Sequence, residues 1–553
     1  MGVRRAGTES TEATPDGQLA RRAGVVSAAV FASRILGVVR EQVFAGLFGA
    51  GRELDAFVTA FRIPNLLRDL FAEGALSAAF VATFTQHHER RGPEAAWRLA
   101  NLVVNTLALT IVPICLLGIA FAPAITRAIA PGFVGTPGKV ALTVELTRIM
   151  MPFLLLVALA AIAMGILNTR NRFGVPALAS AFFNLGSIVG GIGCAWWFAP
   201  GHVATAVASL GGTAPADPAG AARAIVGMAI GTLVGGLLQL LVQVPSLRRV
   251  GFRYRPILDL RDPGVHQVVR LMAPATIGAA AVQVNVFVNS NFASYLGDGP
   301  VSWLNVAFRF MQLPIGLFGV AVGTVALPAL SRHAARKDLG ALRGMLRQAL
   351  VLTATLSIPA AAALAAFGVP VIGLIYEHGR FHEADTAAAA RALAGYALGL
   401  AGYAGIKVVT PAFYALDDAR TPMRVALLSI GVNLLLNWLF VRQLGLGHVG
   451  LAVSTSCVAI ANFALLAAIL GHRVGAFASG LGIEIGRILL ATLVMVAAAA
   501  AAEPLAVRAV PAAGPLQYAA RVAALGLAGG AAYLLACRVL GVGVPRLRRR
   551  PAA

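Results

Sequence analysis

The chain has 553 residues, of which 58% are hydrophobic and only 12% are charged, whereas soluble proteins average about 25% charged residues. This composition excludes an ordinary soluble domain. The net charge of +22 would suggest a nucleic-acid ligand in a soluble protein, but no recognition motif accompanies it, and we expect no nucleic-acid partner. The four cysteines are scattered singly without metal-ligand spacing and are expected to be packing residues.

Continuously apolar runs of about 20 residues recur along the chain, which is the length that crosses a bilayer as a helix. The sequence therefore predicts an all-α polytopic membrane protein. The first run has no signal-cleavage site and is expected to be retained. Fourteen transmembrane spans are predicted, at residues 24–48, 54–85, 94–121, 139–167, 176–198, 219–244, 264–296, 300–330, 341–366, 387–415, 423–442, 449–471, 484–502 and 515–539.

Basic residues set the expected orientation of these spans. With the N-terminus inside, most of the 45 basic residues fall in cytoplasmic segments, as the positive-inside rule requires. Both termini are therefore predicted to be cytoplasmic. The predicted segments are an N-terminal tail (1–23), an N-lobe of spans 1–6 (24–244), a linker (245–263), a C-lobe of spans 7–12 (264–471), spans 13–14 (472–539) and a basic tail (540–553).

The sequence also indicates an internal repeat. FRIPNLLRDLF at 61–71 aligns with FRFMQLPIGLF at 308–318 at an offset of 247, and the turns before Pro176 and Pro422 match at almost the same offset. Six helices per unit preserve orientation, so we expect two parallel six-helix repeats with spans 13 and 14 added. This arrangement favours a transporter with a central cavity between two lobes.

Several charged residues lie inside the predicted spans, where a charge facing lipid costs at least about 2.5–3.5 kcal/mol. At 100° per residue, Arg34 and Glu41 share a face of the first span, and Arg40 lies elsewhere. In the second span Arg62, Asn65, Asp69 and Glu73 form a stripe, with Arg68 to one side. The structural alternative is a network that pairs Arg62 with Asp69 and Arg34 with Glu41. Arg148 and Lys407 stand alone and are expected to snorkel or pack.

The functional interpretation of these arginines is an anion site. Guanidinium groups bind phosphate through paired hydrogen bonds and stay charged at physiological pH. Several of them converging in one cavity indicate a polyanionic ligand such as a diphosphate.

Long stretches of the chain resemble a known family. SRILGVVREQVFAGLFGAGRELDAF at 33–57, the following FRIPNLLRDLFAEGALSAAFV at 61–81, GILNTRNRFGVPA at 165–177 and YEHGRF at 376–381 are similar to the MurJ/MviN lipid II flippases of the multidrug/oligosaccharidyl-lipid/polysaccharide exporter superfamily. The resemblance implies a multi-pass bacterial cytoplasmic-membrane protein that moves lipid II from the inner to the outer leaflet by alternating access. It also implies the substrate-binding residues Arg34, Arg40, Arg68, Arg309, Ser33 and Asn65, with Glu41, Asp55, Glu73 and Arg62 in supporting or gating roles.

The chain departs from the family in two places. Around Arg309, Phe308 and Gln312 stand where many relatives carry acids, which puts the ion pairing of that arginine in doubt. Some relatives hold sodium with acids, whereas this chain offers neutral groups that bind a hard cation less strongly. The weak sodium candidates are Asn289, Asn433, Asn437 and Thr455, for which amide packing between helices is the favoured alternative.

The function expected from the resemblance is transport of lipid II without catalysis. No cofactor is expected, and the membrane potential or a cation gradient could reset the cycle. Membrane lipids and the cell-wall synthesis machinery are further expected partners. Two alternatives remain: an exporter of another lipid-linked oligosaccharide or a drug, and, less favoured, an enzyme acting on lipid pyrophosphates. The pair Asp417–Asp418 lacks a third acid and is better explained by turn chemistry.

Overall fold

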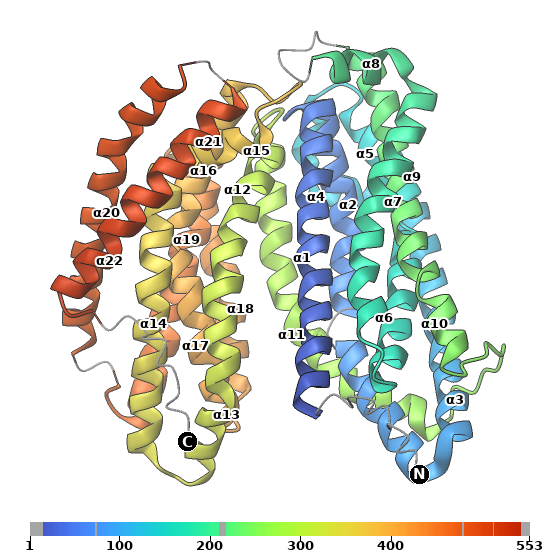
Figure 1. The fold of residues 1–553 in the computed structure, drawn as a ribbon. Helices are drawn as coiled ribbons and strands as arrows, with labels where there is room; N and C mark the ends of the chain where they lie inside the picture. Colours follow the sequence, from blue (N-terminus) through green and yellow to red (C-terminus); the bar gives the residue numbers. More distant parts are fainter. Residues whose placement is uncertain (1–14, 72–74, 210–216, 478–479, 512–513, 543–553) are drawn as a thin grey trace, which may run out of the picture.

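The computed structural model describes residues 15–71, 75–209, 217–477, 480–511 and 514–542. The regular elements in these ranges are helices, as an apolar chain in a membrane requires, because helices satisfy their own backbone hydrogen bonds. The helices form two bundles that stand side by side (Figure 1). Most of the predicted N-terminal tail and most of the basic C-terminal tail lie outside the described residues.

The first bundle contains the helices up to α10. Their bounds are α1 (Pro15–Phe48), α2 (Arg52–Phe71), α3 (Ala75–Ala120), α4 (Ala122–Ile129), η1 (Pro131–Gly135), α5 (Lys139–Met150), α6 (Phe153–Thr169), α7 (Gly174–Phe198), α8 (Pro200–Ala208), α9 (Pro218–Leu241) and α10 (Val244–Arg249). Gly92 has a φ of 84° inside α3 and marks a kink between two helices. This kink lies between the ends of the predicted second and third spans.

The second bundle follows the linker. Its elements are α11 (Pro263–Ser294), α12 (Pro300–Pro314), η2 (Ile315–Val320), α13 (Ala321–Ala335), α14 (Leu339–Ala366), α15 (Gly368–Tyr376), α16 (Glu383–Ala397), α17 (Leu400–Ala415), α18 (Arg420–Asn437), η3 (Trp438–Gln443) and α19 (Gly447–Val474). The added C-terminal helices are α20 (Leu481–Ala509), α21 (Pro515–Ala524), η4 (Leu525–Gly529) and α22 (Gly530–Val539), which pack on the outside of this bundle (Figure 1).

Among the described residues, ten helices are long and apolar enough to cross a membrane. The number rises to eleven if α16 and α17, which are bent by 42°, form one span. Helices α1 and α2 are not among them, and both carry several charged residues. The count of fourteen spans therefore stays a prediction.

The two bundles repeat one packing pattern. In the first bundle α1 packs on α7, α2 on α5, α3 on α6 and α7 on α9. In the second bundle α11 packs on α18, α12 on α16, α14 on α17 and α18 on α19. Each helix pair in the first bundle corresponds to the pair at the same position along the chain of the second bundle, as the predicted duplication requires. The duplication places α2 and α12, which carry the two matched Phe-Arg pairs, in equivalent positions.

Candidate functional site

A pocket of about 780 Å³ lies between the two bundles. Its wall is formed by residues of α1, α2, α6, α7 and α9 from the first bundle, and by residues of α11, α12, α15, α16 and α19 from the second. Of the predicted site residues, the pocket is lined by Arg40, Glu41, Arg62, Asn65, Arg68, Asn289, Arg309 and Thr455. The volume is within the range of ligand pockets, about 300–1,000 Å³.

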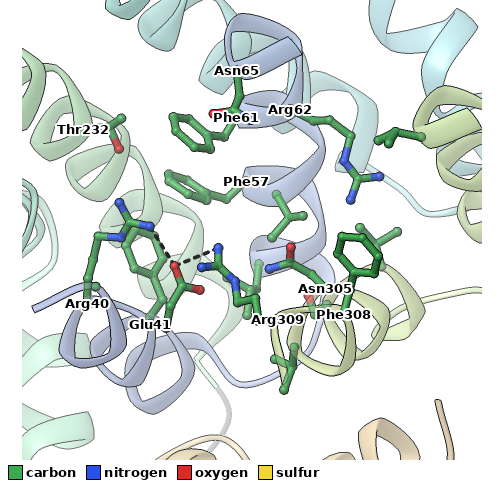
Figure 2. A pocket seen from close by; sticks show the side chains of 18 of the residues that line it. Arg40, Glu41, Phe57, Phe61, Arg62, Asn65, Thr232, Asn305, Phe308 and Arg309 are labelled. Carbon is green, nitrogen blue, oxygen red and sulfur yellow. Dashed lines mark hydrogen bonds and ion pairs between the residues drawn. The ribbon is translucent and has the colours of Figure 1, made fainter. Parts of the chain in front are cut away.

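Two arginines from different bundles meet on one carboxylate. The Oε1 atom of Glu41 accepts hydrogen bonds from Arg40 Nη2 at 2.9 Å and from Arg309 Nη2 at 3.0 Å, as Figure 2 shows. The Arg309 side chain is 43% exposed and has donors left to offer. Three charged groups at this point leave a net positive charge facing the pocket. The acids missing beside Arg309 are thus replaced by a carboxylate from α1.

The other two arginines that line the pocket, Arg62 and Arg68, bind to residues other than Glu41. Arg62 donates to the Ser290 hydroxyl of α11, so the predicted pair with Asp69 is not formed. Asp69 pairs with Arg68 at 2.9 Å and accepts from Gln283 at 3.0 Å. These contacts connect α2 to α11 across the pocket.

Other predicted site residues lie elsewhere. Arg34 is exposed and does not line the pocket, and its predicted pairing with Glu41 is wrong because Glu41 receives Arg40 and Arg309. Ser33 also lies outside the lining and accepts at its carbonyl from Asn184. Glu73 lies outside the described residues. The binding roles of these residues remain predictions.

Asp55 lies in the first turn of α2, which follows the upper end of α1 in Figure 1. Its side chain forms a seal between the two bundles. This fully buried carboxylate accepts from the Gly299 and Ser302 amides, each at 2.8 Å, and from the Ser302 hydroxyl at 2.6 Å. Gly299 and Ser302 are at the start of α12, where free amides and the helix dipole favour an anion. Asp55 of the first bundle thus caps the helix that carries Arg309.

Lys139 completes this seal and was missed by the sequence analysis. Its Nζ atom donates to Asp55 at 3.0 Å and to Asp298 of the second bundle at 2.7 Å. It also lies 4.1 Å from the centre of the Phe133 ring. A fully buried lysine is rare unless it is paired, and here two carboxylates from different bundles supply that pairing.

The loop that follows α15 makes a second contact between the bundles at the same end. The Arg380 amide donates to the Gly46 carbonyl of α1 at 3.0 Å, and Gln42 donates to the Ile375 carbonyl at 3.0 Å. Burial lowers the pKa of the His378 imidazole, which contacts the Gln42 carbonyl at 3.2 Å. The YEHGRF stretch is therefore a docking segment for the end of α1.

We predict that Gly379→Ala disrupts this docking. Gly379 has a φ of +64°, and a Cβ atom there would lie 2.4 Å from the Gly46 carbonyl oxygen. The matched control is Gly297→Ala, where φ is +87° but nothing lies within 4 Å. Both substitutions place a Cβ atom on a left-handed backbone, which costs about 1–2 kcal/mol. A larger loss of transport in Gly379→Ala than in Gly297→Ala therefore reports the steric clash with Gly46. Equal losses in the two variants would count against the docking role.

The weak sodium candidates lie together, but their groups are engaged with one another. Asn437 donates to the Asn289 side-chain oxygen at 2.8 Å, and Asn289 donates to the Thr455 hydroxyl at 3.1 Å. Asn433 donates to Asn285 at 3.1 Å. This ladder joins α11 to α18 and α19, while the buried Asn437 Oδ1 atom accepts no hydrogen bond within the described structure. Amide packing and the weak sodium site both stay predictions. In the described chain no cluster of three or more His, Cys, Asp or Glu residues is suited to hold a metal.

Asp418, considered above as part of an acidic pair, has its oxygens occupied in a turn. It accepts from the Thr421 amide at 3.0 Å, from the Thr421 hydroxyl at 2.6 Å and from Arg473 at 2.5 Å. These hydrogen bonds, with those from Thr421 largest, lower the pKa of Asp418 to about 2. The carboxylate therefore stabilises the start of α18, as turn chemistry predicts.

The family model and the relatives most similar in sequence name one family. Residues 44–511 match the family model described as lipid II flippase MurJ. The lipid II flippase MurJ of Burkholderia cenocepacia is 36% identical over 80% of this chain and 81% of its own. The probable lipid II flippase MurJ of Vibrio cholerae is 35% identical over 82% of this chain and 83% of its own.

Solved structures agree with this similarity. A lipid II flippase MurJ in an inward closed conformation superposes with a TM-score of 0.72 and 27% identity, covering 93% of this chain and 98% of its own. An inward-facing multidrug resistance MATE transporter superposes with a TM-score of 0.62 at 14% identity, over 81% of this chain and 96% of its own. The MATE likeness shows a shared fold.

Proposed function

The chain belongs to the lipid II flippase MurJ family, and from this premise we propose that Arg40 and Arg309 hold the diphosphate of lipid II while the protein moves it across the membrane. The observation that carries this proposal is the meeting of the two guanidinium groups on Glu41 inside the pocket. A diphosphate offers more oxygen acceptors than one carboxylate, and guanidinium groups match its geometry. Arg68 and Arg62 line the same pocket and supply further positive charge.

The protein is a multi-pass inner-membrane protein that transports its ligand. We propose that the lower end in Figure 1 faces the cytoplasm, because α10 and α13 end there and the basic segments 246–255 and 332–337 include their C-terminal ends. The positive-inside rule places such segments in the cytoplasm. The seal around Asp55 would then be the outer gate, closed in this conformation.

The contacts suggest an order of events for one transport cycle. Lipid II enters the pocket from the inner leaflet, and its diphosphate takes the place of the Glu41 carboxylate on Arg40 and Arg309. The loss of the Glu41–Arg309 bridge frees one link between the bundles. The bundles then move apart at the outer end, where Asp55 leaves the start of α12. Glu41 returns to the arginines as the lipid departs, and the membrane potential or a cation gradient resets the cycle.

A depletion experiment tests this function. We expect the gene to restore growth of bacteria that lack their own lipid II flippase, and to restore the exposure of lipid II on the outer leaflet. The control strain expresses a membrane protein of the MATE fold at the same level. A chain that reaches the membrane in normal amount but leaves lipid II inside would overturn the proposal.

A further inference from the structure

An unexplained row of aromatic rings leads away from the arginines. Arg40 lies over the Phe183 ring at 5.2 Å. The rings of Phe183 and Phe153, and those of Phe153 and Phe61, have centroids 5.5 Å apart. Phe61 stacks on Phe57 at 6.2 Å. All four rings line the pocket. Phe57 and Phe153 are buried, and Phe61 and Phe183 are partly exposed, so the latter two rings offer most of the apolar surface beside a ligand held by Arg40.

Amide side chains without a protein partner face the same space. In the described structure, the amides of Asn65 on α2 and of Asn305 and Gln312 on α12 line the pocket and make no hydrogen bond to protein groups. Asn184, by contrast, donates to two carbonyls. Polar groups within a membrane protein normally have partners. These free amides are therefore available to a ligand.

The two features meet on one face of α2. Phe57, Phe61 and Asn65 are spaced by four residues, which places them on one side of a helix, and Figure 2 shows them along the pocket wall. Asn305 of α12 is drawn across the same space. A ring surface next to an amide matches a pyranose that bears an acetamido group. The apolar C–H face packs on the negative face of an aromatic ring, and an amide can both donate to and accept from the acetamido group.

We propose that Phe57, Phe61 and Asn65, with Asn305 opposite, form a subsite for the N-acetylated sugar next to the diphosphate. This proposal rests on the proposed function, because Arg40 and Arg309 fix where the diphosphate lies. The arginines bind any lipid diphosphate. The subsite explains how the pocket distinguishes a lipid diphosphate that carries a sugar from one that carries none. The arginines supply binding strength, and the amide and aromatic groups supply discrimination.

A binding experiment with two probes tests the subsite. The probes are undecaprenyl diphosphate without sugar and the same lipid diphosphate bearing the N-acetylated disaccharide, each titrated against the purified full chain in lipid nanodiscs. Wild type is expected to bind the sugar-bearing probe about tenfold more tightly. Each lost hydrogen bond is worth about 0.5–1.5 kcal/mol, so Asn65→Ala should weaken binding of the sugar-bearing probe roughly two- to thirteenfold. Phe61→Leu, which keeps an apolar side chain, should weaken binding of the sugar-bearing probe by a similar factor. Both variants should bind the probe without sugar with an affinity within about twofold of wild type.

Controls separate this proposal from the one before it. Arg148→Ala changes an exposed arginine outside the pocket and should leave both probes unchanged. Equal binding of the two probes by wild type, or equal weakening of both by Phe61→Leu and Asn65→Ala, would overturn the sugar subsite while leaving the diphosphate site intact. Failure of wild type to bind either probe would overturn the proposed function itself.

Discussion

Replacing Arg309 by alanine is expected to lower lipid II transport at least tenfold while the protein still folds. The Arg309 side chain is 43% exposed to the pocket and bonds to Glu41 at 3.0 Å, so its removal takes little packing from α12. Hydrogen bonds to charged groups contribute about 1.5–3 kcal/mol each, which corresponds to about a ten- to 150-fold change. Arg40→Ala should have a similar effect, because its guanidinium binds the same carboxylate.

Transport of a fluorescent lipid-linked diphosphate into the outer leaflet of proteoliposomes measures this effect. Arg309→Lys keeps the charge but lacks the planar fork, so an intermediate rate is expected. Arg148→Ala is the matched control, since Arg148 lies in a membrane helix outside the pocket and donates to the Ile119 carbonyl. Normal transport by both Arg309→Ala and Arg40→Ala would show that the diphosphate is held elsewhere.

Charge in an apolar sequence predicts that arginines of distant spans face a cavity, because a charge in a membrane helix must avoid lipid. The resemblance to the family then singles out Arg40 and Arg309, which line the pocket. Helix geometry grouped Glu41 with Arg34 and not with Arg40, whereas the structure pairs Glu41 with Arg40 and Arg309. Arg34 belonged to the same motif but is exposed. It precedes Arg40 by six residues, and 600° of helix rotation leaves the two side chains about 120° apart. The composition indicates that the charged residues face a cavity. Only the tertiary packing determines which face of α1 lines that cavity.

The contacts of Lys139 between the two bundles could not be predicted from the sequence. It stands at the start of an apolar run, where a lysine is usually a solvated or snorkelling residue. Its partners Asp55 and Asp298 are 84 and 159 residues away, so no local pattern connects them. The Glu41–Arg309 pair is equally remote and forms because the two bundles dock. Contacts between lobes are therefore the part of the site that required coordinates.

The internal repeat connects the sequence to the seal. The offset of 247 that aligns Arg62 with Arg309 also aligns Asp55 with Ser302, and these two residues are hydrogen-bonded. A residue that touches its own repeat equivalent lies next to the pseudo-symmetry axis that relates the two halves. In the proposed cycle the bundles move apart at the outer end, so the hydrogen bonds between Asp55 and Ser302 must break. The strength of these bonds therefore contributes to the free energy of opening.

Asp55→Asn is expected to weaken that seal and to open the upper end of the pocket. An asparagine keeps the size of the side chain but has one acceptor oxygen. Its NH2 group would face either the donors of Gly299 and Lys139 or the two donors of Ser302. The loss of charge-assisted bonds of about 1.5–3 kcal/mol should shift the closed-to-open equilibrium about ten- to 150-fold. Because a transporter needs both states, transport should fall although the lipid site is unchanged.

Labelling with a membrane-impermeant thiol reagent applied from outside measures the opening. A cysteine placed at Asn305 in the pocket, in a chain whose four native cysteines are replaced, should react faster when Asp55 is asparagine. Asp298→Asn is the matched control, because Asp298 binds the same Lys139 but is 42% exposed and contributes less when solvated. A labelling rate that stays at the wild-type value in Asp55→Asn would mean that the loop after α15, and not the capped start of α12, keeps the outer end closed.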